Sequence, residues 1–313
     1  MPRRDELPAR VTVYEVGPRD GLQNIDTPFD TDVRVRFVEA LAETGLPAIE
    51  VGAFVSPRAI PQMAATDQVY ARLRRRPGVR YPALVPNEQG FDAALAAGVD
   101  EIAVFTAASE TFNRRNINAS IAESLARFAP VVQRARRANV RVRGYVSTCF
   151  GCPYEGPVAP RVVHQVTRDL FALGVAEVSI GDTIGVAVPT QVEEVVGPLL
   201  DEFPAAAIAL HFHDTRGTAL ANVLAALGLG VHVFDTSAGG LGGCPYAPGA
   251  TGNLATEDLV HMLHGMGIET GIDLEKLVDA SLVAEAALRA PLPSRVLRAV
   301  LAERRRRADP PVH

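Results

Sequence analysis

Apolar stretches about as long as a β-strand alternate with amphipathic stretches along most of the chain. The pattern predicts strands at 11–16, 48–54, 79–85, 101–105, 140–147, 175–180, 208–213 and 231–234. It predicts helices at 32–44, 60–75, 90–97, 120–139, 160–173, 190–202 and 219–229. Strand alternating with helix is typical of βαβ units on a parallel sheet. Eight such strands, apolar on both faces, predict an α/β fold with a closed (β/α)8 TIM barrel.

Two further helical stretches, 254–266 and 274–290, follow the eighth strand, and a tail rich in Arg and Pro comes after them. Four consecutive arginines, 304–307, stand in that tail; we interpret them as a solvated helix end, since nothing else in the chain signals a basic surface. No linker or low-complexity segment interrupts the alternation. We therefore expect one catalytic TIM-barrel domain over 1–313, with the barrel at about 11–265, C-terminal helices at about 266–303 and a basic tail at 304–313.

The composition excludes several classes of protein. The 313 residues are 48% hydrophobic, enough for a full core, yet no apolar run is long enough to span a membrane. A net charge of −5 gives no electrostatic reason to expect a nucleic-acid partner. Three cysteines argue against a disulfide framework, and the N-terminal residues lack a hydrophobic signal core, so we expect a cytoplasmic protein.

One count bears on mechanism. Lys276 is the single lysine of the chain, and it lies in a stretch of helical character rather than at a strand end. An enzyme that activates a carbonyl through a Schiff base needs a lysine in its active site. Any aldol-type chemistry in this chain should therefore depend on a metal.

Polar residues gather where the predicted strands end, which is the face of a barrel where chemistry takes place. They are Arg19 and Asp20 after the first strand, Glu50 in the second, Asp182 after the sixth, His211 and His213 on the seventh, and the loop with Cys244 after the eighth. Residues two apart on a strand point to the same face, so the two imidazoles face one way. Such a pair, with carboxylate and amide oxygens available, suits a divalent metal that accepts mixed N and O ligands.

At these positions the chain resembles the hydroxymethylglutaryl-CoA lyase family over roughly residues 11–290. Among the matching motifs are Glu15-Val-Gly-Pro-Arg-Asp-Gly-Leu-Gln-Asn24, Gly181-Asp-Thr-Ile-Gly185, His211-Phe-His-Asp-Thr215 and Gly239-Gly-Leu-Gly-Gly-Cys-Pro-Tyr246. The resemblance implies a carbon–carbon lyase on a TIM barrel. Such a lyase cleaves the acyl-CoA substrate 3-hydroxy-3-methylglutaryl-CoA to acetoacetate and acetyl-CoA, as in leucine degradation. It also implies one Mg²⁺ or Mn²⁺ per site and a homodimer.

The resemblance further implies roles for single residues. Asp20, His211, His213 and Asn253 match the metal ligands. Arg19 matches the catalytic arginine that stabilises the enolate, with Glu50 as its support, and Cys244 matches a cysteine that works in proton transfer from a flexible loop. Asp182 matches an active-site carboxylate, and the group that takes the hydroxyl proton stays open among Asp20, His211 and Asp182. We expect substrate contacts from Gln23, Arg19, Arg114 and Arg115, the last two towards the CoA phosphates.

Three departures from the family pattern bear on the acyl group. Arg216 stands where the family commonly has tyrosine, Ala53 stands where many members have Ser or Thr, and Ile25 and Asp26 follow Asn24 without the lysine that some members carry. A lyase for a longer 3-hydroxy-3-alkylglutaryl-CoA is therefore one alternative. Another is a Claisen-type condensing enzyme of the isopropylmalate or homocitrate synthase group, which usually has a further C-terminal domain that we do not expect here. A barrel kept only for binding would show erosion at the ligand positions, and none is seen.

Overall fold

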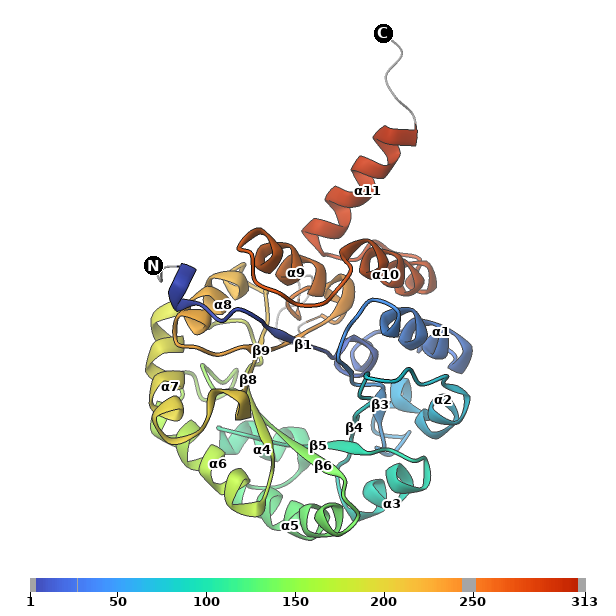
Figure 1. Cartoon of the computed structure of the whole chain (residues 1–313). Coiled ribbons are helices and arrows are strands. Elements are labelled where there is room, and N and C mark those ends of the chain that lie inside the picture. The colour runs from blue at the N-terminus through green and yellow to red at the C-terminus, as the bar shows by residue number, and fades with distance from the viewer. Residues whose placement is uncertain (1–3, 27, 244–251, 309–313) are drawn as a thin grey trace.

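The computed structural model describes residues 4–26, 28–243 and 252–308, and within them a single curled sheet lies inside a ring of helices (Figure 1). The strands pair in the order β2-β1-β9-β8-β7-β6-β5-β4-β3, and every pairing is parallel. Their bounds are β1 Thr12–Glu15, β2 Ala48–Ile49, β3 Gly52–Ala53, β4 Ala83–Leu84, β5 Glu101–Ala107, β6 Arg141–Ser147, β7 Glu177–Asp182, β8 Ile208–Phe212 and β9 Val233–Thr236.

The two ends of this order, β2 and β3, are consecutive pieces of one extended segment, so the sheet closes on itself. The backbone N–H of Glu50 donates to the carbonyl of Glu15 at 2.8 Å, and that of Val51 donates to the carbonyl of Pro82 at 2.9 Å. The segment therefore hydrogen-bonds to β1 on one side and to the residue just before β4 on the other. The nine strands occupy eight positions around the barrel, and the predicted TIM-barrel fold is confirmed.

Helices cover the outside of the barrel. Their bounds are α1 Thr31–Ala42, α2 Thr66–Arg72, α3 Glu88–Ala96, α4 Glu110–Ile117, α5 Ile121–Arg137, α6 Pro160–Leu173, α7 Pro189–Glu202, α8 Ala219–Gly228, α9 Thr256–Gly265, α10 Leu274–Leu288 and α11 Arg295–Ala308. Short turns of helix are η1 Arg4–Glu6, η2 Gly17–Gly21, η3 Pro61–Met63, η4 Ala205–Ala207 and η5 Ala238–Gly240. Several helices begin at a capping side chain; for α5, Ser120 and Glu123 form a capping box that satisfies the first free N–H groups.

Three elements differ from the sequence-based prediction. The helix predicted at 60–75 is divided into η3 and α2, because Ala65 between them has a left-handed backbone, with φ of 55°. Residues 110–117, which are in none of the predicted helices, form α4, which Ser109 caps. The expected tail is helical as far as Ala308, because α11 continues through the four arginines.

Helix α11 projects away from the barrel (Figure 1). Near its end, the guanidinium of Arg304 forms ion pairs with Glu275 and Asp279 of α10, the latter at 2.6 Å. These pairs fasten the helix to the body of the protein from the side that faces α10. Such exposed pairs contribute little stability, about 0–1 kcal/mol each.

The space between strands and helices is apolar, whereas the interior of the barrel carries charge. Tyr14, Arg143 and Asp235 are inside it and at most 1% exposed. A buried charge needs a partner of opposite sign, and these interior groups provide partners for one another, as described below. In the part of the chain that the structure describes, no helix has the length and hydropathy needed to cross a membrane.

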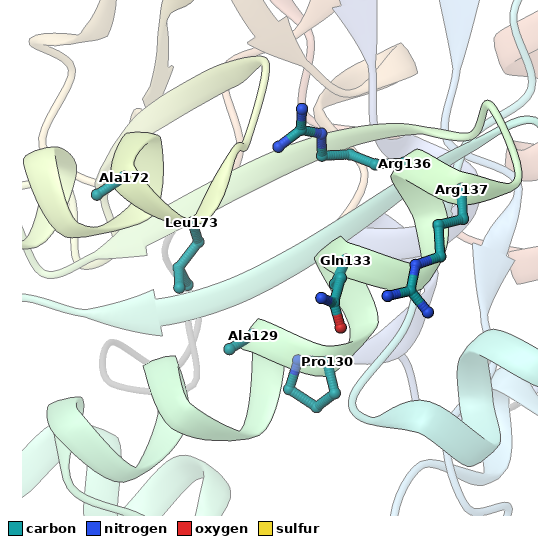
Figure 2. A pocket seen from close by; sticks show the side chains of 7 residues that line it. All are labelled: Ala129, Pro130, Gln133, Arg136, Arg137, Ala172 and Leu173. Carbon is teal, nitrogen blue, oxygen red and sulfur yellow. The ribbon is translucent and has the colours of Figure 1, made fainter.

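A groove of about 830 Å³ lies between α5 and α6, lined by Ala129, Pro130, Gln133, Arg136, Arg137, Ala172 and Leu173 (Figure 2). Several of these residues are in the last turns of α5 and α6, which lead into β6 and β7. The groove is therefore on the amino-terminal side of the sheet. Barrel enzymes carry out their chemistry at the carboxyl ends of the strands, so this groove is not the active site.

Candidate active site

The loop after β1 forms a turn of π-helix, η2, that carries Arg19 and Asp20. The guanidinium of Arg19 is buried between two carboxylates: its Nε donates to Glu50 Oε2 at 2.7 Å, and a terminal nitrogen donates to Asp20 Oδ1 at 2.6 Å. It also lies 5.0 Å from the ring centre of Tyr145, whose hydroxyl donates to Glu50 at 3.1 Å. Burial alone would lower the pKa of Arg19, but Glu50 and Asp20 outweigh it and raise the pKa. Arg19 is thus a permanently charged group in a fixed position.

Strand β8 brings two imidazoles to the same end of the barrel. His211 and His213 are on one face of the strand, with Phe212 buried on the other, and their ring centres are 5.2 Å apart. One nitrogen of each imidazole and one carboxylate oxygen of Asp20 all lie within 4.8 Å of one another. The Nε2 atom of His211 is 4.0 Å from Asp20 Oδ2. These distances leave room for one cation between the three side chains.

Asn253 comes to the same place from beyond β9. Its backbone forms a β-bridge with His213, and its side-chain Nδ2 donates to the carbonyl of Leu241 at 3.1 Å. The Oδ1 atom is buried and has no hydrogen-bond partner among the described residues. Gln23 joins the group by donating from Nε2 to Asp20 Oδ1 at 3.0 Å. The structure therefore brings together the four side chains that the sequence suggested as metal ligands.

The chemistry of this donor set fits a divalent cation. An unpartnered buried amide oxygen is costly unless a ligand satisfies it, and Asn253 Oδ1 is such an atom next to a carboxylate and two imidazoles. Oxygen and nitrogen donors in this mixture suit Mg²⁺, Mn²⁺ or a related ion. These four side chains would hold such an ion and leave room for water or substrate beside it.

The protonation states of Asp20 and His213 also suit ligands, whereas His211 must lose a proton to bind: burial would lower its pKa, but Asp235 and Asp20 outweigh burial and raise it. Burial would raise the pKa of Asp20, but the charge of Arg19 and the two imidazoles outweigh it and hold the pKa below its usual value. Burial and the neighbouring His211 lower the pKa of His213 to about 3. At neutral pH, Asp20 is therefore ionised and His213 is neutral, the forms in which each side chain binds a metal.

Asp182 is at the end of β7 and is 1% exposed. Both of its carboxylate oxygens accept backbone N–H groups, from Val186 at 2.9 Å and Ala187 at 3.0 Å. Burial raises its pKa to about 6. The same turn is held from outside by Arg216, which donates to the carbonyls of Ile184 and Gly185. Arg216 thus fastens the loop after β7.

Two arginines expected to contact substrate are apart from the ligand group. Arg114 and Arg115 are exposed on α4, after β5. Arg115 stacks over the ring of Tyr154 at 4.1 Å, and Arg114 is 3.9 Å from Glu110. Cys244 lies outside the described residues. The two described cysteines, Cys149 and Cys152, are buried and free.

Two sets of buried acids next to this site were not predicted from the sequence. Glu15 and Glu257 accept the backbone N–H groups of Ala238 and Gly239, at 2.9 and 2.8 Å, and so hold the start of the glycine-rich loop after β9. Asp235 is behind His211, with Oδ2 at 3.5 Å from Nδ1. The period of two along β1 and β9 places Asp235 on the same inward face as its register partner Tyr14, and places Glu15 on the opposite face of β1.

The fold is a (β/α)8 barrel, and the donor atoms lie at the carboxyl ends of its strands. These two features define the class: a barrel enzyme with a candidate metal-binding site. The model of the HMGL-like family matches residues 10–283. Hydroxymethylglutaryl-CoA lyase of Gallus gallus mitochondria is 53% identical over 273 residues, 87% of this chain and 92% of that protein. The 3-hydroxy-3-isohexenylglutaryl-CoA/hydroxymethylglutaryl-CoA lyase of Pseudomonas aeruginosa is 52% identical over 95% of this chain and 99% of that one.

A crystal structure of hydroxymethylglutaryl-CoA lyase from Pseudomonas aeruginosa matches with a TM-score of 0.93 at 52% identity, and the match covers 95% of this chain and 99% of that one. The chain belongs to the hydroxymethylglutaryl-CoA lyase family, a family of carbon–carbon lyases. The family expected from the sequence motifs is confirmed.

Proposed function

We propose that this protein is a hydroxymethylglutaryl-CoA lyase that uses Mg²⁺ or Mn²⁺, one ion per site, to cleave 3-hydroxy-3-methylglutaryl-CoA to acetoacetate and acetyl-CoA. The observation that carries the proposal is the convergence of Asp20, His211, His213 and Asn253 beside the fixed guanidinium of Arg19. The names of relatives more than half identical in sequence support the choice of substrate.

In this reaction the tertiary hydroxyl loses its proton, the bond between C2 and C3 breaks, and the electron pair moves into the thioester as an enolate. When bound, the divalent cation supplies positive charge that makes the hydroxyl more acidic. Arg19 supplies a second positive charge, which we assign to the thioester oxygen, where negative charge develops. Its two ion pairs hold it in place before substrate arrives, so little reorganisation is needed as the bond breaks.

Proton transfer involves two groups in this proposal. The hydroxyl proton goes to Asp20, His211 or Asp182; burial raises the pKa of Asp182, but backbone N–H groups already bond to both of its oxygens. Cys244, carried over from the family motif, protonates the enolate carbon of acetyl-CoA. The glycine-rich loop that carries it starts next to Asn253, because Leu241 accepts the amide of that residue.

The finer points rest on the same resemblance. We assign Gln23 to substrate binding through Asp20, and Arg114 and Arg115 to the CoA phosphates. We also propose a single catalytic unit over 1–313, a homodimer, a cytoplasmic location and a role in leucine degradation. A second candidate substrate is a longer 3-hydroxy-3-alkylglutaryl-CoA, since the Pseudomonas aeruginosa relative is named for an isohexenyl substrate as well as for the methyl one.

The test is an assay of purified protein, stripped of metal with a chelator and then given Mg²⁺ or Mn²⁺. We expect acetoacetate from 3-hydroxy-3-methylglutaryl-CoA only when metal is added. Cleavage of the isohexenyl homologue alone would establish the second candidate. Condensation of acetyl-CoA with a 2-oxo acid, with no cleavage of either substrate, would overturn the proposal in favour of a Claisen-type synthase.

A further inference from the structure

A network of buried polar groups fills the barrel directly beneath His211. Asp235 on β9 is the register partner of His211 on β8, so the two side chains are at the same level on the inner face of the barrel. Asp235 is 1% exposed, and its Oδ2 lies 3.5 Å from Nδ1 of His211. The other ring nitrogen, Nε2, faces Asp20 at 4.0 Å. The imidazole therefore lies between two carboxylates, one on each nitrogen.

Asp235 is held firmly from its other side. Arg143 on β6 donates to both oxygens, at 2.6 Å and 3.1 Å, and the hydroxyl of Ser179 on β7 donates to Oδ2 at 2.7 Å. Arg143 has no exposed surface and is bound in turn to Glu177 at 2.6 Å. Its guanidinium lies 4.0 Å from the ring centre of Tyr14. A two-pronged pair between Arg and carboxylate fixes orientation as well as charge, so Asp235 has one available position.

These contacts suggest a purpose beyond structure. In a neutral imidazole, one ring nitrogen carries a hydrogen and the other carries a lone pair. A hydrogen-bond partner on one nitrogen determines which of the two carries the hydrogen. We propose that Asp235 is a positioning residue: it accepts the Nδ1–H of His211 and so presents the lone pair of Nε2 to the cation, with Arg143 and Ser179 fixing Asp235 for that task. The inference rests on the proposed metal-dependent function and deepens it.

The second imidazole provides a contrast within the same site. The Nδ1 atoms of both histidines are buried, and neither makes a hydrogen bond of standard geometry to a described residue, but the Nδ1 of His211 has a carboxylate oxygen of Asp235 at 3.5 Å. Among the described residues, His211 is therefore the member of the pair that has a carboxylate within 4.0 Å of its Nδ1, and its strand hydrogen-bonds directly to β9. A carboxylate behind a ligating histidine is a recurrent arrangement at metal sites, and its removal typically costs about 10–100-fold in metal affinity or activity.

The experiment compares Asp235→Asn with a matched control, Glu177→Gln. Both variants remove one negative charge that pairs with Arg143, but Glu177 bonds to the Nε side of Arg143 and leaves the contact between Asp235 and His211 in place. The first readout is ¹⁵N NMR of the histidine rings in metal-free protein at alkaline pH, where the His211 ring is neutral although Asp235 and Asp20 raise its pKa, with His211 assigned by comparison with His211→Gln. The second readout is calorimetric titration of the metal-free protein with Mn²⁺.

In the unaltered protein and in Glu177→Gln, we expect His211 to be the tautomer protonated on Nδ1, with equal Mn²⁺ affinity. In Asp235→Asn, we expect ring shifts typical of mixed tautomers and Mn²⁺ affinity lower by about 10–100-fold. Ser179→Ala removes one hydrogen bond to Asp235 and should shift both readouts in the same direction by a smaller amount. If Asp235→Asn does not fold, Ser179→Ala tests the proposal in its place.

An unchanged tautomer and an Mn²⁺ affinity within about twofold of the unaltered protein would overturn the proposal. So would equal effects in Asp235→Asn and Glu177→Gln. The NMR result does not depend on lyase activity. Failure of the positioning role of Asp235 can therefore be distinguished from failure of the proposed lyase function.

Discussion

Gly252 is the position at which one added methyl group should disturb the site most. A Cβ atom built there would lie 2.1 Å from the carbonyl oxygen of Gly242 and 2.8 Å from the carbonyl carbon of Gly243. Contacts of real Cβ atoms essentially never fall below 3.0 Å, so in Gly252→Ala the two backbone segments must separate by about 1 Å. The backbone of Gly252 is not left-handed, and the effect is therefore steric alone.

The displacement would reach the metal ligands through the backbone. The carbonyl of Gly252 accepts the N–H of Asp214 at 2.7 Å, and the next residue, Asn253, forms the bridge to His213. A shift of about 1 Å at a reacting group can cost on the order of 10²-fold in rate. Overpacking of this kind also costs about 1–3 kcal/mol in stability. We expect Gly252→Ala to lower turnover by about 10²-fold and to weaken Mn²⁺ binding.

Gly243→Ala is the matched control, because a Cβ atom at Gly243 meets no atom of the described residues within 4 Å. Steady-state kinetics with 3-hydroxy-3-methylglutaryl-CoA, calorimetric titration with Mn²⁺ and urea unfolding should be measured for both variants. The control should stay within about twofold of the unaltered protein. If Gly252→Ala behaves like Gly243→Ala, the close packing of the loop ends does not position Asn253, and the reasoning is wrong.

Three further results are expected. Arg19→Lys keeps the charge but lacks the planar guanidinium that bonds Glu50 through Nε and Asp20 through a terminal nitrogen, so kcat should fall by about 10²–10³-fold; near-normal steady-state kinetics would exclude Arg19 from enolate stabilisation. Burial raises the pKa of Glu257 from 4.5 to about 7, so the folded protein binds this proton more tightly than the unfolded chain does. The contribution of Glu257 to the free energy of unfolding therefore declines as pH rises from about 4.5 to 7. In urea unfolding, Glu257→Gln should gain stability relative to the unaltered protein between pH 5 and pH 8. A difference in stability that does not vary with pH would contradict this. Cys244→Ala should lower turnover by about 10²–10⁴-fold without loss of Mn²⁺ affinity, whereas unchanged turnover would remove the thiol from the mechanism.

The fold could be predicted because local patterns determine it. Apolar runs alternating with amphipathic stretches predict the barrel, and a period of two is enough to place His211 and His213 on one face of a strand. The loop after β1 was recognisable as part of the site because Arg19 and Asp20 follow closely after an apolar strand. Where the pattern was weak, the prediction was wrong: the left-handed backbone of Ala65 divides a predicted helix, and an alanine gives no sequence signal for that conformation.

The supporting groups of the site were not predictable in the same way. Asp235 comes directly after the apolar run that ends at Phe234, and a charged residue usually signals the end of a strand, yet β9 continues through it to Thr236. Only the fold shows that Arg143, far away in sequence, neutralises Asp235 inside the barrel. The same is true of Glu257, whose partner Gly239 is in the loop after β9. A buried charge depends on a distant partner, and hydrophobic periodicity contains no information about that partner.

The most direct test of the account is a crystal structure of the protein soaked with Mn²⁺, with the ion located by its anomalous scattering. We expect one peak, bonded to Asp20, His211, His213 and Asn253 at distances of about 2.0–2.3 Å, with Nε2 as the ligating atom of His211. A peak elsewhere, or full Mn²⁺ occupancy in protein in which Asp20 and His211 have both been replaced by alanine, would contradict the central claim that these side chains hold the catalytic ion.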